Sequence, residues 1–77
     1  MDDFAKVLGT QIKIIRVKKD LSQQEVAARA NITPSYMSRI ENGSISTSVE
    51  KLYQIAQAMD CQPAELLPEF TFASDPE

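Results

Sequence analysis

The stretch Gln23-Gln-Glu-Val-Ala-Ala-Arg-Ala-Asn-Ile-Thr-Pro-Ser-Tyr-Met-Ser-Arg-Ile40 decides the fold, because it holds two short helical patterns about three residues apart. Ser22-Gln-Gln-Glu25 has the spacing of a capping box, so it predicts the start of the first helix. Asn31 predicts the end of that helix, because asparagine tolerates the left-handed conformation of a tight helix terminus. Thr33 as cap and Pro34 at the first helical position predict the start of the second helix.

The residue types inside this stretch suit two helices that cross steeply and expose one face. Ala27 is small enough to permit a close approach between the helices. The apolar residues that would anchor the second helix to a core are Ile32, Met37 and Ile40. The positions that must stay short and polar if this helix is to enter a groove are Thr33, Ser35 and Ser38. Together these features predict a helix-turn-helix.

The sequence before and directly after this unit is also helical in spacing. Ahead of it, residues recur at steps of three and four, which predicts one core-facing stripe on a first helix. The stripe consists of Phe4, Val7, Leu8, Gln11, Ile12 and Ile15. This helix should end near Lys18-Lys19-Asp20, and Asn42-Gly43 should end the third helix. No long stretch alternates with the period of a strand, so the predicted fold class is all-α.

Two further helices are predicted towards the C-terminus. Thr47-Ser-Val-Glu50 has the pattern of a second capping box and should open a fourth helix. Its inward residues are Leu52, Ile55, Ala56 and Met59. Pro63 should begin a short fifth helix that Pro68 ends. We therefore expect one five-helix domain over residues 1–68 and an acidic, disordered tail over residues 69–77.

The composition argues against several classes of function. The chain has no histidine, and its single Cys61 neither forms an internal disulfide nor matches a metal-ligand spacing, so we expect no metal and no cofactor. No apolar run reaches the roughly 20 residues of a membrane span, and Asp2 and Asp3 stand where a signal peptide would be basic. There is no Gly-rich phosphate loop, so we expect no enzymatic activity. From these features we expect a cytoplasmic protein.

The net charge of −3 needs an explanation if the partner is a polyanion. The acidic residues are concentrated at the ends of the chain. Between Phe4 and Leu67, eight Lys and Arg residues face six Asp and Glu residues, a net of +2. Half of these cations lie in one short segment: Lys13, Arg16, Lys18 and Lys19. Phosphate binding depends on the local field of one face, so the total charge does not exclude a nucleic-acid partner.

Residues 6–67 resemble the lambda-repressor-like Cro/CI (XRE-type) DNA-binding domains, and the matching segments occur in the order of that family. The segments are Ile14-Ile-Arg16, Leu21-Ser-Gln23, Val26-Ala27, Met37-Ser-Arg-Ile-Glu-Asn-Gly43, and Leu52 to Met59. The resemblance implies five helices, of which the third lies in the major groove of double-stranded DNA. Restriction-modification controller proteins are similar in length.

The resemblance also implies two sets of DNA contacts. Base edges would be reached by Thr33, Pro34, Ser35, Tyr36, Ser38 and Arg39. Phosphates would be bound by Gln23, Gln24, Asn42, Ser44 and Ser46. Several members of the family, notably restriction-modification controller proteins of similar length, carry an arginine at the position of Pro34. Proline has no charge and cannot donate a hydrogen bond. Readout here would therefore depend more on the neighbouring residues and on DNA shape.

Some of these residues have a second interpretation. If Gln23 does not bind a phosphate, it is only a first-turn residue of a capped helix. Tyr36 either touches a sugar or a base methyl group or packs beneath its own helix. Arg39 either reaches a guanine or pairs with an acid such as Glu41. For Arg16 the resemblance implies a structural pairing with Glu41 rather than a DNA contact.

Dimerisation is implied as well, because the family pairs through its C-terminal helices. The candidate interface residues are Val49, Tyr53, Leu66, Leu67 and Phe70, with Phe72 beside them. The alternative is that they complete the core of one chain. A symmetric dimer would act on a palindrome-like operator as a transcriptional regulator, either autoregulatory or of a restriction-modification, plasmid or phage type. The alternative function is a protein-interaction module, such as an antitoxin or accessory subunit, that binds a protein partner and little or no DNA.

Overall fold

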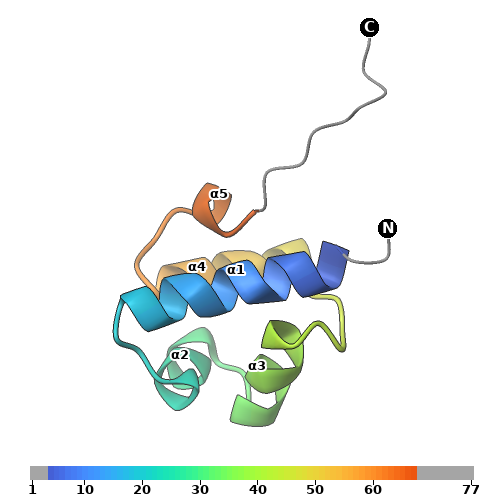
Figure 1. Ribbon diagram of the computed structural model, residues 1–77. Coiled ribbons are helices and arrows are strands. Elements are labelled where there is room, and N and C mark those ends of the chain that lie inside the picture. Colours follow the sequence, from blue (N-terminus) through green and yellow to red (C-terminus); the bar gives the residue numbers. More distant parts are fainter. Residues whose placement is uncertain (1–3, 68–77) are drawn as a thin grey trace, which may run out of the picture.

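The computed structural model describes residues 4–67, which form five helices (Figure 1). The helices are α1 (Phe4–Lys18), α2 (Gln23–Ala30), α3 (Pro34–Glu41), α4 (Val49–Ala58) and α5 (Pro63–Leu66). No strand occurs in this part of the chain, so the predicted all-α, five-helix fold is confirmed. The predictions for the tail 69–77, including Phe70 and Phe72, lie outside the described residues.

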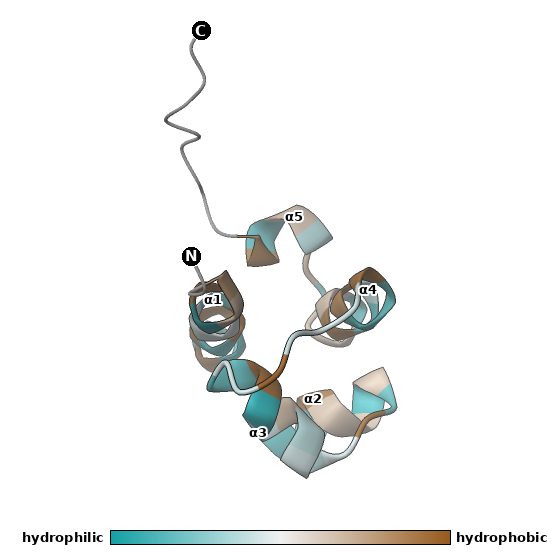
Figure 2. Cartoon of the chain, turned by 90° about the vertical axis from the view of Figure 1, so that its right-hand side faces the viewer, coloured by the Kyte–Doolittle hydropathy of each residue, from teal (hydrophilic) through white to brown (hydrophobic). Residues whose placement is uncertain are grey.

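The core lies between α1 and α4. Figure 2 shows these two helices flanking the centre, with α5 on one side of them and the α2–α3 pair on the other. In agreement with this arrangement, α2 packs on α3 and α4, α3 packs on α1, and α5 packs on both α1 and α4. The largest fully buried side chains are Ile12, Val26, Met37, Ile40, Ile55, Met59 and Leu66. Every helix contributes to this set, so the two-helix motif is part of the same core.

The caps of the helix-turn-helix form as the sequence predicted. Ser22 Oγ accepts the backbone N–H of Glu25, and the Glu25 carboxylate accepts the backbone N–H of Ser22, which completes the capping box of α2. Asn31 ends α2 at a φ of 62°, in the left-handed region. Thr33 Oγ1 accepts the N–H of Tyr36 at the start of α3. These local interactions fix both ends of the turn.

The predicted capping box at the start of α4 is wrong by one residue. Ser48, not Thr47, is the cap, and its hydroxyl oxygen accepts the N–H of Lys51. The third helical position is then a lysine, which cannot accept a hydrogen bond from the cap as Glu50 would. Thr47 Oγ1 is instead buried without a hydrogen-bond partner. Two adjacent residues can both cap a helix, and the sequence pattern alone favoured the wrong one.

The apolar stripe predicted for α1 is only partly correct. Leu8 and Ile12 are buried, but Phe4 and Val7 are 48% and 39% exposed. Gly9, which apolar spacing does not detect, is buried against α3. A Cβ atom on Gly9 would lie 2.3 Å from the carbonyl oxygen of Ile40. The two backbones therefore meet at Gly9, and this contact sets how closely α3 approaches α1.

Candidate nucleic-acid interface

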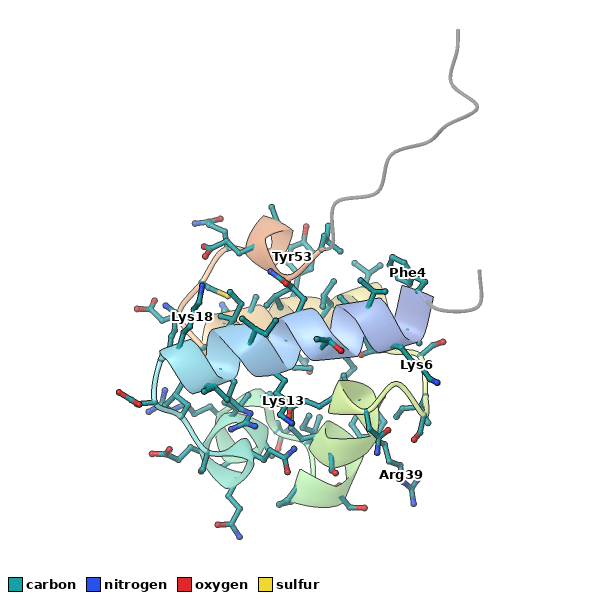
Figure 3. The ribbon with its side chains drawn as sticks, in the orientation of Figure 1. Phe4, Lys6, Lys13, Lys18, Arg39 and Tyr53 are labelled. Atoms are coloured by element: carbon teal, nitrogen blue, oxygen red, sulfur yellow. The ribbon has the colours of Figure 1, made fainter. Side chains whose placement is uncertain are left out.

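Helix α3 exposes a short, mostly polar surface on the side of the molecule away from α5 (Figure 1). Of the residues predicted to reach base edges, Thr33, Pro34, Ser35 and Arg39 are exposed and Ser38 is partly exposed. The side chain of Arg39 extends outward from α3 (Figure 3) and makes no hydrogen bond or ion pair with residues 4–67. The alternative pairing of Arg39 with Glu41 does not form.

Tyr36 differs from the other predicted base-edge residues. Its ring is partly buried and packs against the core cluster. The ring therefore lies beneath its own helix, which was the alternative interpretation of Tyr36. The opposite side of α3 is anchored by Met37 and Ile40, which are buried. The helix is therefore held by apolar contacts on one face and leaves the other face free to meet a ligand.

A part-buried network ties α3 to α1 and α2. Arg16 Nε donates to Glu41 Oε2 at 2.6 Å, and Arg16 Nη2 donates to Glu41 Oε1 at 3.1 Å, so the predicted structural pair is present. Arg16 Nη1 also donates to the carbonyl oxygen of Leu21 at 2.7 Å. Gln23 Nε2 donates to Glu41 Oε1 at 2.9 Å. The last residue of α3 thereby holds one side chain from α1 and one from the start of α2.

A small hollow lies next to this network, where α1, α2 and α3 meet. Its lining residues are Lys13, Gln23, Ser38, Glu41 and Asn42. The charge of Glu41 is balanced by Arg16, so Lys13 supplies the uncompensated charge of the hollow. The other groups can donate hydrogen bonds through amides or a hydroxyl. A cation surrounded by such donors matches the chemistry of a phosphate oxygen.

Of the cations on α1 and directly after it, Lys13 is the one that lines this hollow. In Figure 3, Lys13 points from α1 towards α2 and α3, whereas Lys18 lies at the far end of the helix on the α5 side. Lys19 Nζ donates to the carbonyl oxygen of Asp60, at the end of α4. Sequence reasoning left open which of these residues faces a nucleic acid. Gly9, Lys13 and Arg16 stand four and three residues apart, so all three lie on one face of α1. This spacing is the sequence feature that could have identified Lys13 as the cation that faces α2 and α3.

The remaining predicted phosphate ligands follow α3 or begin α2. Asn42, Ser44 and Ser46 are exposed in the loop after α3. Asn42 Oδ1 accepts hydrogen bonds from the backbone N–H and the hydroxyl group of Ser44, which leaves the two amide hydrogens of Asn42 for another acceptor. Gln24 is exposed in the first turn of α2.

The start of α2 also carries a negative charge. The pKa of the Glu25 carboxyl is lowered, first by the hydrogen bond from the backbone N–H of Ser22. Its ionised carboxylate therefore lies in the first turn of α2, where it offsets the positive end of the helix dipole. The dipole of α2 therefore offers little attraction to a phosphate, and the phosphate contacts predicted here would depend on the side chains of Gln23 and Gln24.

Comparisons with known proteins identify the family. A family model described as helix-turn-helix matches residues 12–66. The chain belongs to this helix-turn-helix family. The match confirms the family that the sequence segments indicated.

The helix-turn-helix chain has similar proteins in bacteria. An uncharacterised HTH-type transcriptional regulator of Sinorhizobium fredii is 35% identical over 65 residues, which are 84% of each chain. The control protein C.BamHI of Bacillus amyloliquefaciens is 32% identical over 66 residues, 84% of this chain and 80% of that protein. The crystal structure of the restriction-modification controller protein C.AhdI from Aeromonas hydrophila aligns with a TM-score of 0.80 at 30% identity, over 87% of this chain and 100% of that one.

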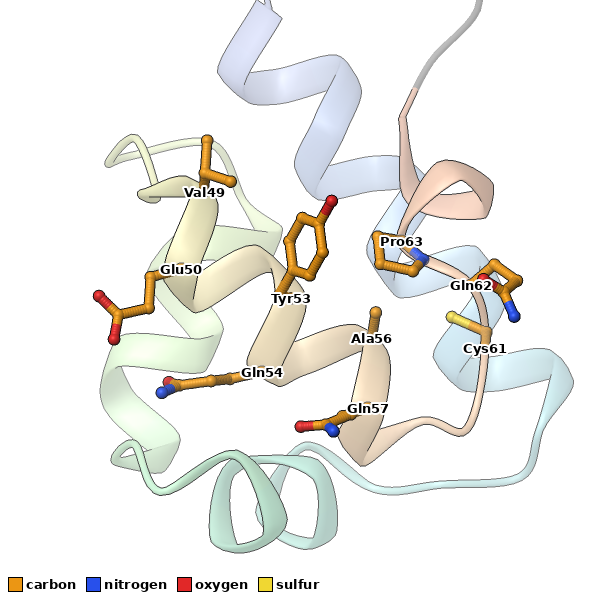
Figure 4. Close-up of a pocket in the computed structure, with 9 residues that line it drawn as sticks. All are labelled: Val49, Glu50, Tyr53, Gln54, Ala56, Gln57, Cys61, Gln62 and Pro63. Carbon is orange, nitrogen blue, oxygen red and sulfur yellow. The ribbon is translucent and has the colours of Figure 1, made fainter.

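The helix-turn-helix chain has a second exposed surface, formed by α4, α5 and the segment between them. Val49 and Tyr53 on α4 are 70% and 56% exposed, and Leu67 after α5 is 47% exposed. Figure 4 shows Val49 and Tyr53 at the rim of an open groove between α4 and Pro63. Gln54 Oε1, also on this groove, is buried without a hydrogen-bond partner.

Leu66 does not belong to this surface. It is fully buried within one chain, because α5 packs against both α1 and α4 with Leu66 directed into the core. The prediction that Leu66 lies at a dimer interface is therefore wrong, and its alternative, completion of the monomer core, is correct.

Cys61 lies in the same groove and is partly buried as a free thiol. Burial raises the pKa of this thiol, and the nearby Glu65 carboxylate raises it further. Over residues 4–67, no group of three or more His, Cys, Asp and Glu residues is placed to hold a metal ion. No helix in the same range has both the length and the apolar character needed to cross a membrane.

Proposed function

We propose that this protein is a sequence-specific, double-stranded DNA-binding transcriptional regulator that inserts α3 into the major groove. The observation that carries the proposal is the exposed face of α3, bordered by the hollow that holds Lys13. The family match supports it, as do relatives whose names describe transcriptional regulators and control proteins. The major groove is wide enough for one helix, and each base pair displays a distinct pattern there.

The exposed residues of α3 divide into two roles. Ser35, Ser38 and Arg39 can offer hydroxyl and guanidinium groups to base edges, and an arginine can bind guanine through two hydrogen bonds. Thr33 keeps a hydroxyl hydrogen to donate while its oxygen caps the helix. Pro34 supplies only apolar contact and brings the start of α3 close to the groove wall. We expect readout by a few direct contacts together with the shape of the DNA.

Phosphate binding beside α3 would fix the register of the protein on the duplex. Lys13, Gln23 and Asn42 converge on one hollow, and Ser44 and Ser46 extend the donor series along the following loop. Such contacts position a protein but carry little sequence information. Residues 4–67 carry a net charge of +2 despite the overall −3. On this side of the domain Lys13 lines the hollow and Arg39 is exposed on α3, so the local charge favours a polyanion.

The acting form is a homodimer joined through α4 and α5. Val49, Tyr53 and Leu67 supply exposed apolar surface there, which a second copy of the chain would bury. A symmetric dimer would present two α3 helices about one duplex turn apart, roughly 34 Å, and would bind a palindrome-like operator. Similarity to control proteins suggests autoregulation or control of a restriction-modification system. Duplex DNA as partner implies action in the cytoplasm, at the nucleoid.

Selection of bound duplexes from a random DNA pool, at near-physiological salt, tests the proposal. We expect a two-fold symmetric motif whose half-sites are about one turn apart. Binding that is salt-sensitive but yields no motif, or no binding at all, would overturn it. That result would favour a protein-interaction module with a protein partner, to which the acidic total charge and Pro34 would then be suited.

A further inference from the structure

The carboxylate of Glu41 is shared between two helices at the edge of the proposed DNA surface. Its Oε1 atom accepts Gln23 Nε2 at 2.9 Å and Arg16 Nη2 at 3.1 Å, and its Oε2 atom accepts Arg16 Nε at 2.6 Å. Glu41 is buried, and its side chain retains only 3% of its accessible surface. Three helices thus meet at one carboxylate: α1 through Arg16, α2 through Gln23 and α3 through Glu41 itself.

This arrangement determines which end of the Gln23 amide faces the hollow. An ionised carboxylate only accepts hydrogen bonds, so it must meet the NH₂ group and not the carbonyl oxygen of Gln23. The NH₂ group carries two hydrogens, of which Glu41 takes one. The second hydrogen has no acceptor among residues 4–67, and Gln23 lines the same hollow as Lys13 and Asn42. Without Glu41, the amide would be free to present its carbonyl oxygen there, and an oxygen would repel a phosphate.

Arg16 has a complementary electrostatic effect. Glu41 lines the hollow, so its negative charge would oppose a bound phosphate. The bidentate contact with Arg16 balances that charge within the protein and leaves Lys13 as the effective charge of the hollow. Arg16 is itself part-buried and also bonded to the carbonyl oxygen of Leu21, so the pair forms on the protein side of the hollow.

We propose that Glu41 is a positioning residue for DNA binding. It holds the Gln23 amide so that one N–H points at a backbone phosphate, and Arg16 keeps the Glu41 carboxylate from repelling that phosphate. This inference rests on the proposed function, because it requires a phosphate in the hollow. It assigns to the Arg16–Glu41 pair a role in DNA affinity beyond the stability of the domain.

A double-mutant cycle on DNA affinity tests the inference. Gln23→Ala is introduced into the parent protein and into the variant Arg16→Met/Glu41→Met, which removes both charges of the pair but keeps apolar volume. One hydrogen bond to a charged group corresponds to about tenfold in affinity, so Gln23→Ala should weaken a dimer about a hundredfold in the parent. In the double-Met background the same change should cost less than about fivefold.

Failure of the inference and failure of the proposed function give different results. If the parent protein selects no duplex, the proposed function fails. If the parent binds its motif but Gln23→Ala costs nothing, or costs the same in both backgrounds, the function stands and the positioning role of Glu41 is overturned. Circular dichroism of each variant confirms that the domains compared are folded.

A conservative variant separates positioning from stability. Glu41→Gln keeps an acceptor oxygen for Gln23 but weakens the ion pair with Arg16. We expect Glu41→Gln to lower the melting temperature while Gln23→Ala still costs about a hundredfold in that background. If the affinity cost of Gln23→Ala instead falls together with the melting temperature in the Glu41→Gln background, the positioning role is contradicted. If the double-Met variant does not fold, NMR of the parent decides: added operator should shift the Gln23 Nε2 hydrogen that is not bonded to Glu41 more than the hydrogen that is bonded to it. Unaffected shifts would refute the inference.

Discussion

Replacing Gly9 by alanine tests how α3 is held on α1. A Cβ atom at this position would lie 2.3 Å from the carbonyl oxygen of Ile40 and 2.6 Å from that of Glu41. Both obstacles are backbone atoms, so no change of side-chain rotamer can relieve them. Ordinary contact begins at 3.4 Å, and α3 must therefore move away from α1 by about 1 Å.

Two opposing effects decide the size of the change. In a free helix, alanine is favoured over glycine by about 1 kcal/mol, so the substitution would stabilise an isolated α1. Forcing extra volume into a packed contact costs about 1–3 kcal/mol, and a backbone clash belongs at the upper end of that range. We expect a net loss of about 2 kcal/mol in the free energy of unfolding, or about 8–16 °C in melting temperature for a domain of this size.

Thermal and urea denaturation followed by circular dichroism at 222 nm measure this effect. The matched control is Thr10→Ala, the next residue on the same helix, which is exposed. This control should be neutral or slightly stabilising, because alanine is the better helix former and no contact is disturbed. If Gly9→Ala is as stable as the parent, or more stable, the close backbone contact between α1 and α3 is refuted.

Three further predictions concern a cap, a titrating group and a cation. Ser48→Ala should lower the free energy of unfolding by about 1 kcal/mol. Thr47→Val should leave the free energy of unfolding unchanged or raise it, because Thr47 Oγ1 is buried without a hydrogen-bond partner. If urea denaturation shows the same loss for both variants, Ser48 is not the cap. The lowered pKa of Glu25 stabilises the fold above pH 4.5, the ordinary value, and this stabilisation is lost as the pH falls through the lower folded-state pKa. The melting-temperature difference between the parent and Glu25→Ala should therefore shrink on acidification, and a difference equal at pH 7 and at low pH would contradict this. Lys13→Gln should reduce the slope of log affinity against log salt concentration by about 2 for a dimer, whereas the control Lys18→Gln should not change this slope. Equal slopes for the two variants in duplex titrations would refute the assignment of Lys13 to a phosphate.

Local interactions explain why so much of the fold was predictable from the sequence. The box at Ser22 and Glu25, the left-handed Asn31 and the Thr33 cap each depend on residues only a few positions apart. The same local pattern failed at Thr47, where two adjacent hydroxyl residues compete. There the choice depends on which register directs the apolar face of α4 inward, and that is a tertiary effect.

Tertiary contacts explain what the sequence did not reveal. Gly9 has no apolar side chain, so periodicity passes over it, and only the approach of α3 makes it essential. Leu66 and Leu67 are adjacent and identical, yet one is buried in the core and the other is exposed. The residue type alone does not show which of two such leucines packs in the core of one chain and which is exposed to a partner. The hydrogen bond from Gln23 to Glu41 joins residues 18 apart in the sequence, and no local pattern predicts it.

The most direct test of the central claim asks whether α3 reads bases. The random-pool selection is repeated with three single variants of exposed α3 residues, Ser35→Ala, Ser38→Ala and Arg39→Ala, and each motif is compared with that of the parent. We expect base preference to be lost at particular positions, symmetrically in both half-sites, while the half-site spacing stays the same. If all three variants select the parent motif unchanged, α3 does not contact the bases and the proposed function of α3 is contradicted.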